Sequence, residues 1–67
     1  MNGYKWIVKD PTGEPVEWAI LLEIGIPMVK VGSNPIAFST EKEVNAYMRK
    51  NHLYQYNGYY KALIKIE

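Results

Sequence analysis

Few side chains in this sequence could carry covalent or metal chemistry. The chain has one histidine and no cysteine, so it cannot build a multi-histidine or thiolate metal site by itself. His52 follows a predicted helix, where the helix dipole favours a cation, and we interpret it as a helix-ending residue. The candidate nucleophiles are Thr12, Ser33, Ser39 and Thr40. None of the four lies in a nucleophile motif. Thr12 has a local role in a turn, and Thr40 has one in a helix cap.

Carboxylate pairs at the spacing of general acid–base catalysis are also not found. Glu17 and Glu23 share one face of a predicted strand but stand about 20 Å apart along an extended chain, whereas glycosidases need about 5–9.5 Å. Glu41 and Glu43 are explained by helix capping. The turn at residues 32–35 lacks the glycine pattern of a phosphate loop. We therefore expect a protein that is not an enzyme, with no catalytic residues, no metal site and no cofactor.

Two sets of side chains are candidates for binding. Four of the six tyrosines crowd into residues 54–60. These rings either stabilise a small sheet through cross-strand pairs or form a protein-binding surface; they are Tyr54, Tyr56, Tyr59 and Tyr60. The second set is a basic helix face, interpreted as a solvated surface or as a phosphate-binding patch; it consists of Lys42, Arg49 and Lys50.

The elements that must position these residues are short strands and one helix. Residues 10–13 (Asp-Pro-Thr-Gly) suit a type I turn after the first strand, and Asn57-Gly58 between tyrosines predicts a type I′ hairpin. The other strands end at turns rich in glycine and proline. The predicted strands are residues 4–9, 28–31, 36–38 and 60–66.

The helix is predicted at about residues 41–51. Thr40 is a suitable N-cap, and Glu43 completes a capping box. Apolar and polar residues then separate at about 100° per residue. The side predicted to be buried consists of Val44, Tyr47, Met48 and Asn51.

Residues 14–25 can be interpreted as a strand or as a helix. Pro15 near the start and Gly25 at the end suit a helix. Strict alternation of apolar residues favours a strand, because the two interior glutamates fall on the opposite face; the apolar set is Val16, Trp18, Ile20, Leu22 and Ile24. We choose the strand and predict one α+β domain over residues 1–67. Its antiparallel sheet has three to five short strands, and one helix packs on one face of the sheet. The order of elements along the chain is β-β-β(-β)-α-β.

Length and charge narrow the function class. A chain of 67 residues buries a thin core, so without disulfides we expect oligomerisation to add stability, most simply as a homodimer. The net charge of +1 gives no reason to expect a polyanion partner. The longest apolar run, residues 18–22, is too short to span a bilayer. We expect a soluble, cytoplasmic protein.

One stretch resembles a known family. Residues 18–32, with the sequence Pro-Met-Val-Lys-Val-Gly at their end, followed by residues 36–41 and the Tyr47 helix, resemble excisionase-type winged-helix proteins. The resemblance implies a truncated winged-helix-like fold and nucleic-acid binding. The chain departs from the family pattern because the first helix of the helix-turn-helix is missing.

The function hypothesis that follows is a small non-catalytic protein-interaction protein. It would occupy the surface of an unidentified partner protein, as a phage or mobile-element accessory protein inhibits a host protein, or it would self-associate. We expect binding at the tyrosines of residues 54–60 and on whichever sheet face the helix leaves open. The alternative is a small nucleic-acid-binding protein that uses Lys42, Arg49 and Lys50.

Overall fold

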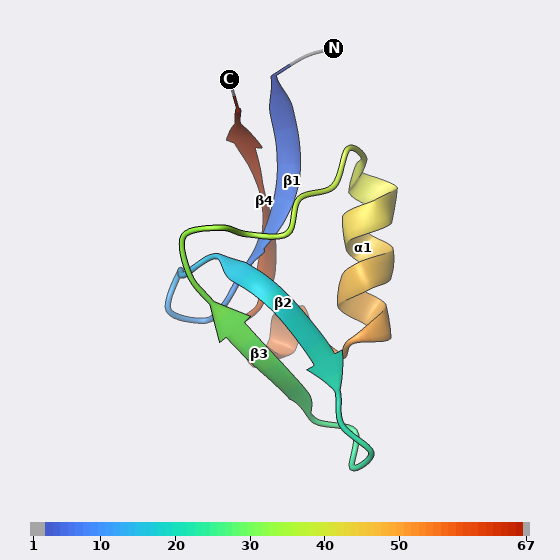
Figure 1. The fold of residues 1–67 in the computed structure, drawn as a ribbon. Helices are drawn as coiled ribbons and strands as arrows, with labels where there is room; N and C mark the ends of the chain where they lie inside the picture. The colour runs from blue at the N-terminus through green and yellow to red at the C-terminus, as the bar shows by residue number, and fades with distance from the viewer. Residues whose placement is uncertain (1–2, 67) are drawn as a thin grey trace.

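The computed structural model describes residues 3–66 and has an α+β fold (Figure 1). Antiparallel strands precede and follow the α-helix, which confirms the predicted fold class. Residues 14–25 contain a strand, so the helix alternative for this stretch is wrong, and so is the winged-helix-like alternative that needs a helix there. In chain order the elements are β1 (Tyr4–Lys9), β2 (Val16–Leu21), β3 (Pro27–Val31), α1 (Glu41–Lys50), the 3-10 helix η1 (Gln55–Asn57) and β4 (Tyr60–Lys65).

The strands of residues 3–66 pair as two two-stranded sheets, which differs from the single sheet expected. β1 pairs with β4 along its whole length, from Tyr4 opposite Lys65 to Lys9 opposite Tyr60. β2 and β3 form a separate hairpin. One isolated bridge, between Lys9 and Pro15, continues the ladder from β1 toward β2 before the strands diverge. The sheet is divided because β1 finds its partner at the far end of the chain and not in the next strand.

The turn between β1 and β2 forms as predicted. Its backbone bond runs from the Gly13 N–H to the Asp10 carbonyl at 2.8 Å. The Asp10 carboxylate accepts hydrogen bonds from the Thr12 N–H, the Thr12 hydroxyl and the Glu14 N–H, at 3.0, 2.7 and 2.9 Å. A short aspartate side chain that satisfies these donors holds the turn tightly.

Helix α1 begins and ends as its sequence predicts. The Thr40 hydroxyl accepts from the Glu43 N–H at 3.2 Å, and the Glu43 carboxylate accepts from the Thr40 N–H at 3.1 Å, which is the expected capping box. Val44 is fully buried and Asn51 is buried at the C-cap. The helix therefore presents the predicted side to the core.

The core lies where α1, the β1–β4 sheet and one face of the β2–β3 hairpin meet (Figure 1). Partly buried rings, including those of Trp6, Phe38, Tyr47 and Tyr59, pack around it. The hairpin points away from the end of the molecule at which β1 begins and β4 ends, and the molecule is elongated, 39 × 22 × 18 Å. The central cluster consists of Val8, Val16, Ala19, Val44 and Leu53.

Two predicted local elements take other forms. Residues 36–38 make a single bridge, in which Phe38 and Trp6 exchange two backbone hydrogen bonds of 2.8 Å, and not a strand. Asn57-Gly58 ends the 3-10 helix η1, with Gly58 at φ 96°, and not a type I′ hairpin. The hairpin does not form because Leu53 is anchored in the core and β4 pairs with β1 instead.

Candidate functional site

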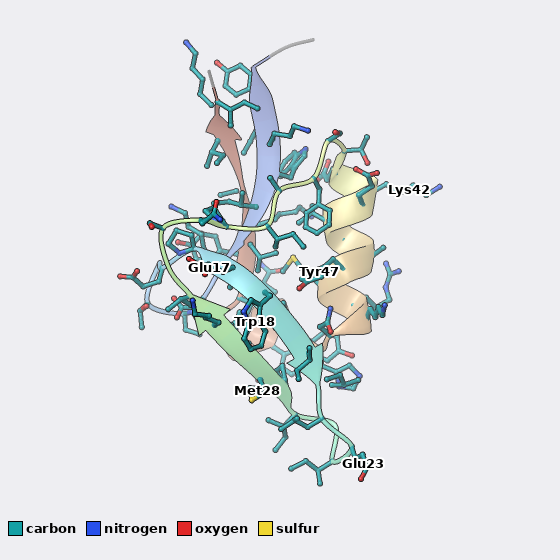
Figure 2. All side chains as sticks on the ribbon, in the orientation of Figure 1. Glu17, Trp18, Glu23, Met28, Lys42 and Tyr47 are labelled. Carbon is teal, nitrogen blue, oxygen red and sulfur yellow. The ribbon has the colours of Figure 1, made fainter. Side chains whose placement is uncertain are left out.

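The β2–β3 hairpin turns one apolar face away from the core. We call this the outer face; its members are Trp18, Ile20, Leu22, Ile24, Ile26 and Met28. Register supports a shared face, since Ile20 is opposite Met28 and cross-strand partners lie on the same side. Figure 2 shows Trp18 and Met28 on the side of the hairpin turned toward the viewer. These side chains are 38–76% exposed, with Ile24 the highest.

The outer face is large for a molecule of this size. Six large apolar side chains with this exposure present on the order of 500 Å² of apolar surface, which equals the largest patch of a typical monomer, about 300–600 Å², on a chain of only 67 residues. The total exposed surface is 4614 Å². These six side chains therefore contribute about one tenth of the molecular surface.

A β-bulge explains why the predicted apolar alternation divides between core and surface. The register shifts between Val16 and Trp18, so Glu17 is an extra residue on β2. A bulge changes which side of the strand the following residues face. Val16 and Ala19 are therefore both buried, although they are three positions apart, while Trp18 is 40% exposed. The expected strand is confirmed, but its apolar set does not share one environment.

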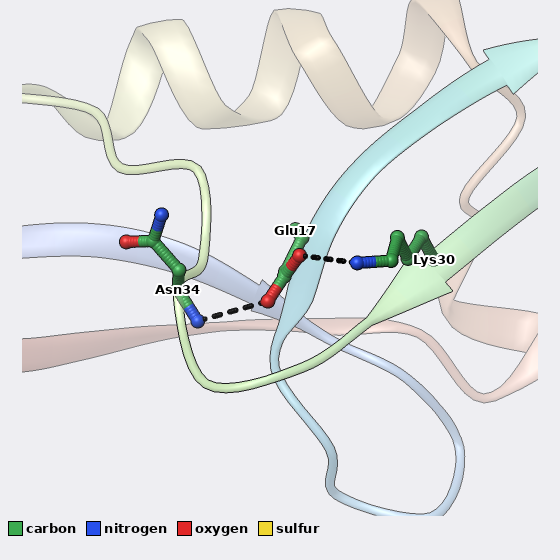
Figure 3. A network of polar contacts seen from close by, with 3 residues as sticks. All are labelled: Glu17, Lys30 and Asn34. Atoms are coloured by element: carbon green, nitrogen blue, oxygen red, sulfur yellow. Dashed lines mark hydrogen bonds and ion pairs between the residues drawn. The ribbon is translucent and has the colours of Figure 1, made fainter.

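The bulge also places a polar network at one end of the outer face (Figure 3). The Glu17 carboxylate accepts from the Lys30 ammonium at 3.0 Å and from the Asn34 N–H at 3.1 Å. A Cβ atom on Gly32 would lie 2.2 Å from the Glu17 Oε2, so glycine leaves room for this carboxylate. The outer face thus has a charge-balanced polar end at Glu17 and Lys30, while the tip of the hairpin carries Ile24 beside the exposed Glu23 (Figure 2).

These contacts make the stability of the protein depend on acidity. The hydrogen bond from Lys30, then the one from the Asn34 N–H, lower the pKa of Glu17 below its ordinary value of 4.5. The hydrogen bond from the Thr12 hydroxyl likewise lowers the pKa of Asp10 below 3.8. A carboxylate whose pKa is depressed on folding stabilises the native state above its unfolded pKa, and this contribution is lost as the pH falls through the folded pKa.

We therefore expect the free energy of unfolding to fall as the pH drops below about 4.5. Glu17→Gln should make this fall shallower, and Lys30→Met should do the same by removing the donor with the largest effect on Glu17. Urea unfolding at a series of pH values between about 2.5 and 7 measures the slope. An unchanged slope in both variants would contradict the assignment.

The edge of β2 that faces α1 is partly closed by a tyrosine. The Tyr47 hydroxyl accepts from the Ala19 N–H at 2.9 Å and donates to the Ala19 carbonyl at 3.3 Å. Figure 2 shows Tyr47 reaching from the helix toward this strand. A groove remains beside this edge, lined by Leu21, Lys50 and Asn51 among others. The tyrosine ties the hairpin to the helix and occupies backbone groups that would otherwise invite another strand.

The second candidate surface is a pocket of about 460 Å³ among α1, η1 and β4. We call it the tyrosine pocket, and Tyr54, Tyr59 and Tyr60 line it together with Arg49. It therefore brings together three of the four tyrosines predicted to bind a partner and one basic side chain of the predicted basic patch. Tyr56 is outside the lining, is 81% exposed, and stacks on Tyr54 with ring centroids 5.0 Å apart.

The end of α1 sets the position of this pocket. His52 adopts a left-handed conformation, φ 57°, directly after the helix. The His52 N–H then donates to the Arg49 carbonyl at 3.3 Å and the Leu53 N–H to the Met48 carbonyl at 2.8 Å, which is a Schellman motif. The chain turns back sharply, Leu53 enters the core, and Tyr54 begins the wall of the pocket.

His52 has the structural role that the sequence suggests. Its ring stacks on Tyr54 at 5.3 Å, and its Nδ1 lies 3.0 Å from the Gly25 carbonyl at the tip of the hairpin. Because a carbonyl oxygen only accepts, Nδ1 carries the proton in this contact. The residue joins the helix end to the hairpin tip.

The three bases of the predicted patch all lie on α1, and two of them line different features of the surface. Arg49 lines the tyrosine pocket, and Lys50 lines the groove beside β2. Lys42, at the other end of the helix, points away from the strands (Figure 2). The basic patch therefore stays a prediction.

The sequence predicted an open sheet face but did not identify the residues of the outer face. The signal of this face was present in the alternation of Trp18, Ile20 and Leu22, but alternation does not say which face the core covers. Within residues 3–66, no three histidine or acidic side chains gather closely enough to hold a metal ion. No helix in the described part of the chain is long and apolar enough to cross a membrane. The sequence matches no protein-family model, and neither a curated protein nor a solved structure is significantly similar to it.

Proposed function

We propose that this chain is a non-catalytic protein-interaction protein that acts as a homodimer, with the outer face as the contact between its two copies. The observation that carries the proposal is the apolar character of that face on a hairpin whose other side already packs against the core. A two-stranded sheet that is apolar on both sides needs a cover on both sides.

The size of the face agrees with what a stable dimer needs. A standard interface buries about 800 Å² on each partner, which is about one sixth of the 4614 Å² exposed by one chain. The outer face supplies more than half of that area as apolar surface, and its rim supplies the rest. Two hairpins packed face to face, about 10 Å apart, would form a small sandwich.

Charge also permits a second copy. Glu17 and Lys30 neutralise each other at the polar end of the outer face, and each chain carries a net charge of only +1. Two copies therefore meet without strong repulsion between like charges.

The wider role proposed here is to occupy the surface of another protein in the cytoplasm, as an inhibitor encoded by a phage or mobile element would do. The protein would use no cofactor. Two features support this wider role: the small size of the chain and the exposed apolar surface of the outer face.

Sedimentation equilibrium tests the dimer directly, at protein concentrations from about 1 to 200 µM. The 7.8 kDa chain should sediment as a dimer. Ile20→Lys places a charge in the middle of the outer face, and it should raise the dimer dissociation constant by about 100-fold or more.

Leu63→Lys is the matched control. Leu63 on β4 is 51% exposed, close to the 47% of Ile20, but lies outside the outer face. This variant should remain dimeric, with circular dichroism confirming that both variants are folded. A wild-type monomer at 200 µM, or equal weakening by both substitutions, would overturn the proposal.

A further inference from the structure

The tyrosine pocket is a second surface that shares no residue with the outer face. Its volume of about 460 Å³ is within the range of small-ligand sites, about 300–1000 Å³. Among its lining residues, Leu53 is 1% exposed and Met48 packs against the core. The deepest part of the pocket is therefore aliphatic, while tyrosine rings form its walls.

Its rim carries a cation that is free to bind a ligand. Within residues 3–66, the Arg49 guanidinium makes no ion pair and no side-chain hydrogen bond. Lys61, the other base of the lining, is already engaged with the Asn45 side-chain carbonyl at 2.7 Å and the Glu41 carboxylate at 3.3 Å. Arg49 thus has its full set of donors available beside a cavity whose lining is both polar and apolar.

We infer that the tyrosine pocket binds a peptide segment in which an aromatic or large aliphatic side chain is accompanied by a carboxylate. The side chain enters the pocket against Leu53 and Met48, and the carboxylate pairs with Arg49, whose planar fork matches it in a bidentate geometry. Tyrosine walls add contact area at low entropic cost. The inference rests on the proposed interaction function and deepens it by naming the chemistry of the partner. It does not depend on the proposed dimer.

The same observations favour a peptide over a nucleic acid. A single free arginine and a net charge of +1 offer little to a strand that carries a phosphate at each nucleotide. An aliphatic pocket floor suits a side chain, whereas bases bind by stacking on open aromatic rings. The stacked rings of His52, Tyr54 and Tyr56 provide such a surface outside the pocket, so single-stranded DNA belongs in the test.

The test is an NMR titration of the whole chain with two matched probes. N-acetyl-L-phenylalanine has the ring and the carboxylate, whereas its amide has the same ring without the charge. The acid should shift backbone amides of the pocket, with a dissociation constant in the low millimolar range for a probe of this size. The amide should bind about tenfold more weakly or worse.

Variants assign the charge effect to one residue. Arg49→Gln should remove the preference for the acid over the amide. Lys42→Gln, which removes a base of the same helix outside the pocket, should preserve it. No pocket shifts up to about 20 mM acid, equal binding of both probes by the wild type, or a lost preference in Lys42→Gln would overturn the inference.

An eight-nucleotide thymidine strand is the third probe. If it displaces the acid from the pocket with an affinity that falls steeply with salt, the site is for nucleic acid and the peptide assignment is wrong. Dimerisation is measured separately by sedimentation, so either proposal can fail while the other stands.

Discussion

Leu53→Ala should remove most of the stability of the protein, so that it unfolds at a much lower urea concentration than the unchanged chain. Leu53 is 1% exposed and belongs to the central core cluster. Truncating a buried leucine costs about 2–5 kcal/mol, through lost burial and the cavity left behind. A domain of this length has only about 3–5 kcal/mol of net stability from its core, so one such cavity consumes most of it.

Leu63→Ala is the control for this effect, since it makes the same chemical change at a position that is 51% exposed. We expect it to cost less than about 1 kcal/mol. Urea unfolding followed by circular dichroism measures both variants, at one fixed protein concentration because the proposed dimerisation would add apparent stability. Comparable losses at the two positions would show that Leu53 is not a central member of the core.

Gly58→Ala should also destabilise the protein strongly, with a loss of about 2–4 kcal/mol in the free energy of unfolding. Two effects combine at this position. Gly58 has φ 96°, a conformation that side chains with a Cβ rarely adopt. A Cβ there would also lie 2.8 Å from the Pro11 Cβ and 2.9 Å from its Cγ. The rigid proline ring cannot move aside cheaply, so the packing of η1 on the first turn would be lost.

Gly25→Ala separates the two effects. Gly25 has a similar φ of 84°, but a Cβ there meets no atom within 4 Å. It should therefore incur only the backbone strain, about 1 kcal/mol. The difference between the two variants in free energy of unfolding measures the contact with Pro11. If both cost the same, the close approach of Gly58 to Pro11 is not a packing constraint.

Both substitutions bear on the candidate sites as well as on stability. Leu53 is part of the tyrosine pocket, and Gly58 ends the 3-10 helix beside it. Binding experiments on the pocket should therefore use surface variants such as Arg49→Gln, which remove the proposed ligand contact without opening the core.

Local chemistry in the sequence was sufficient to predict the best-defined elements. The capping box at Thr40 and Glu43, and the turn at Asp10, depend on groups within four residues of each other. Such contacts form with little loop-closure cost, so their patterns are visible in the sequence alone. The sequence also predicted the α+β class and the order of strands and helix along the chain.

Long-range pairing was decided by the tertiary structure. β1 pairs with β4 across more than fifty residues, and this divides the sheet and replaces the hairpin expected at Asn57-Gly58. Several apolar strands could have taken the place of β4, and their composition does not say which of them pairs with β1. Alternation in β2 revealed a strand, but the bulge at Glu17 and the position of the helix determined which side chains were left exposed. The candidate surfaces depend on these choices because burial is a property of the assembled fold.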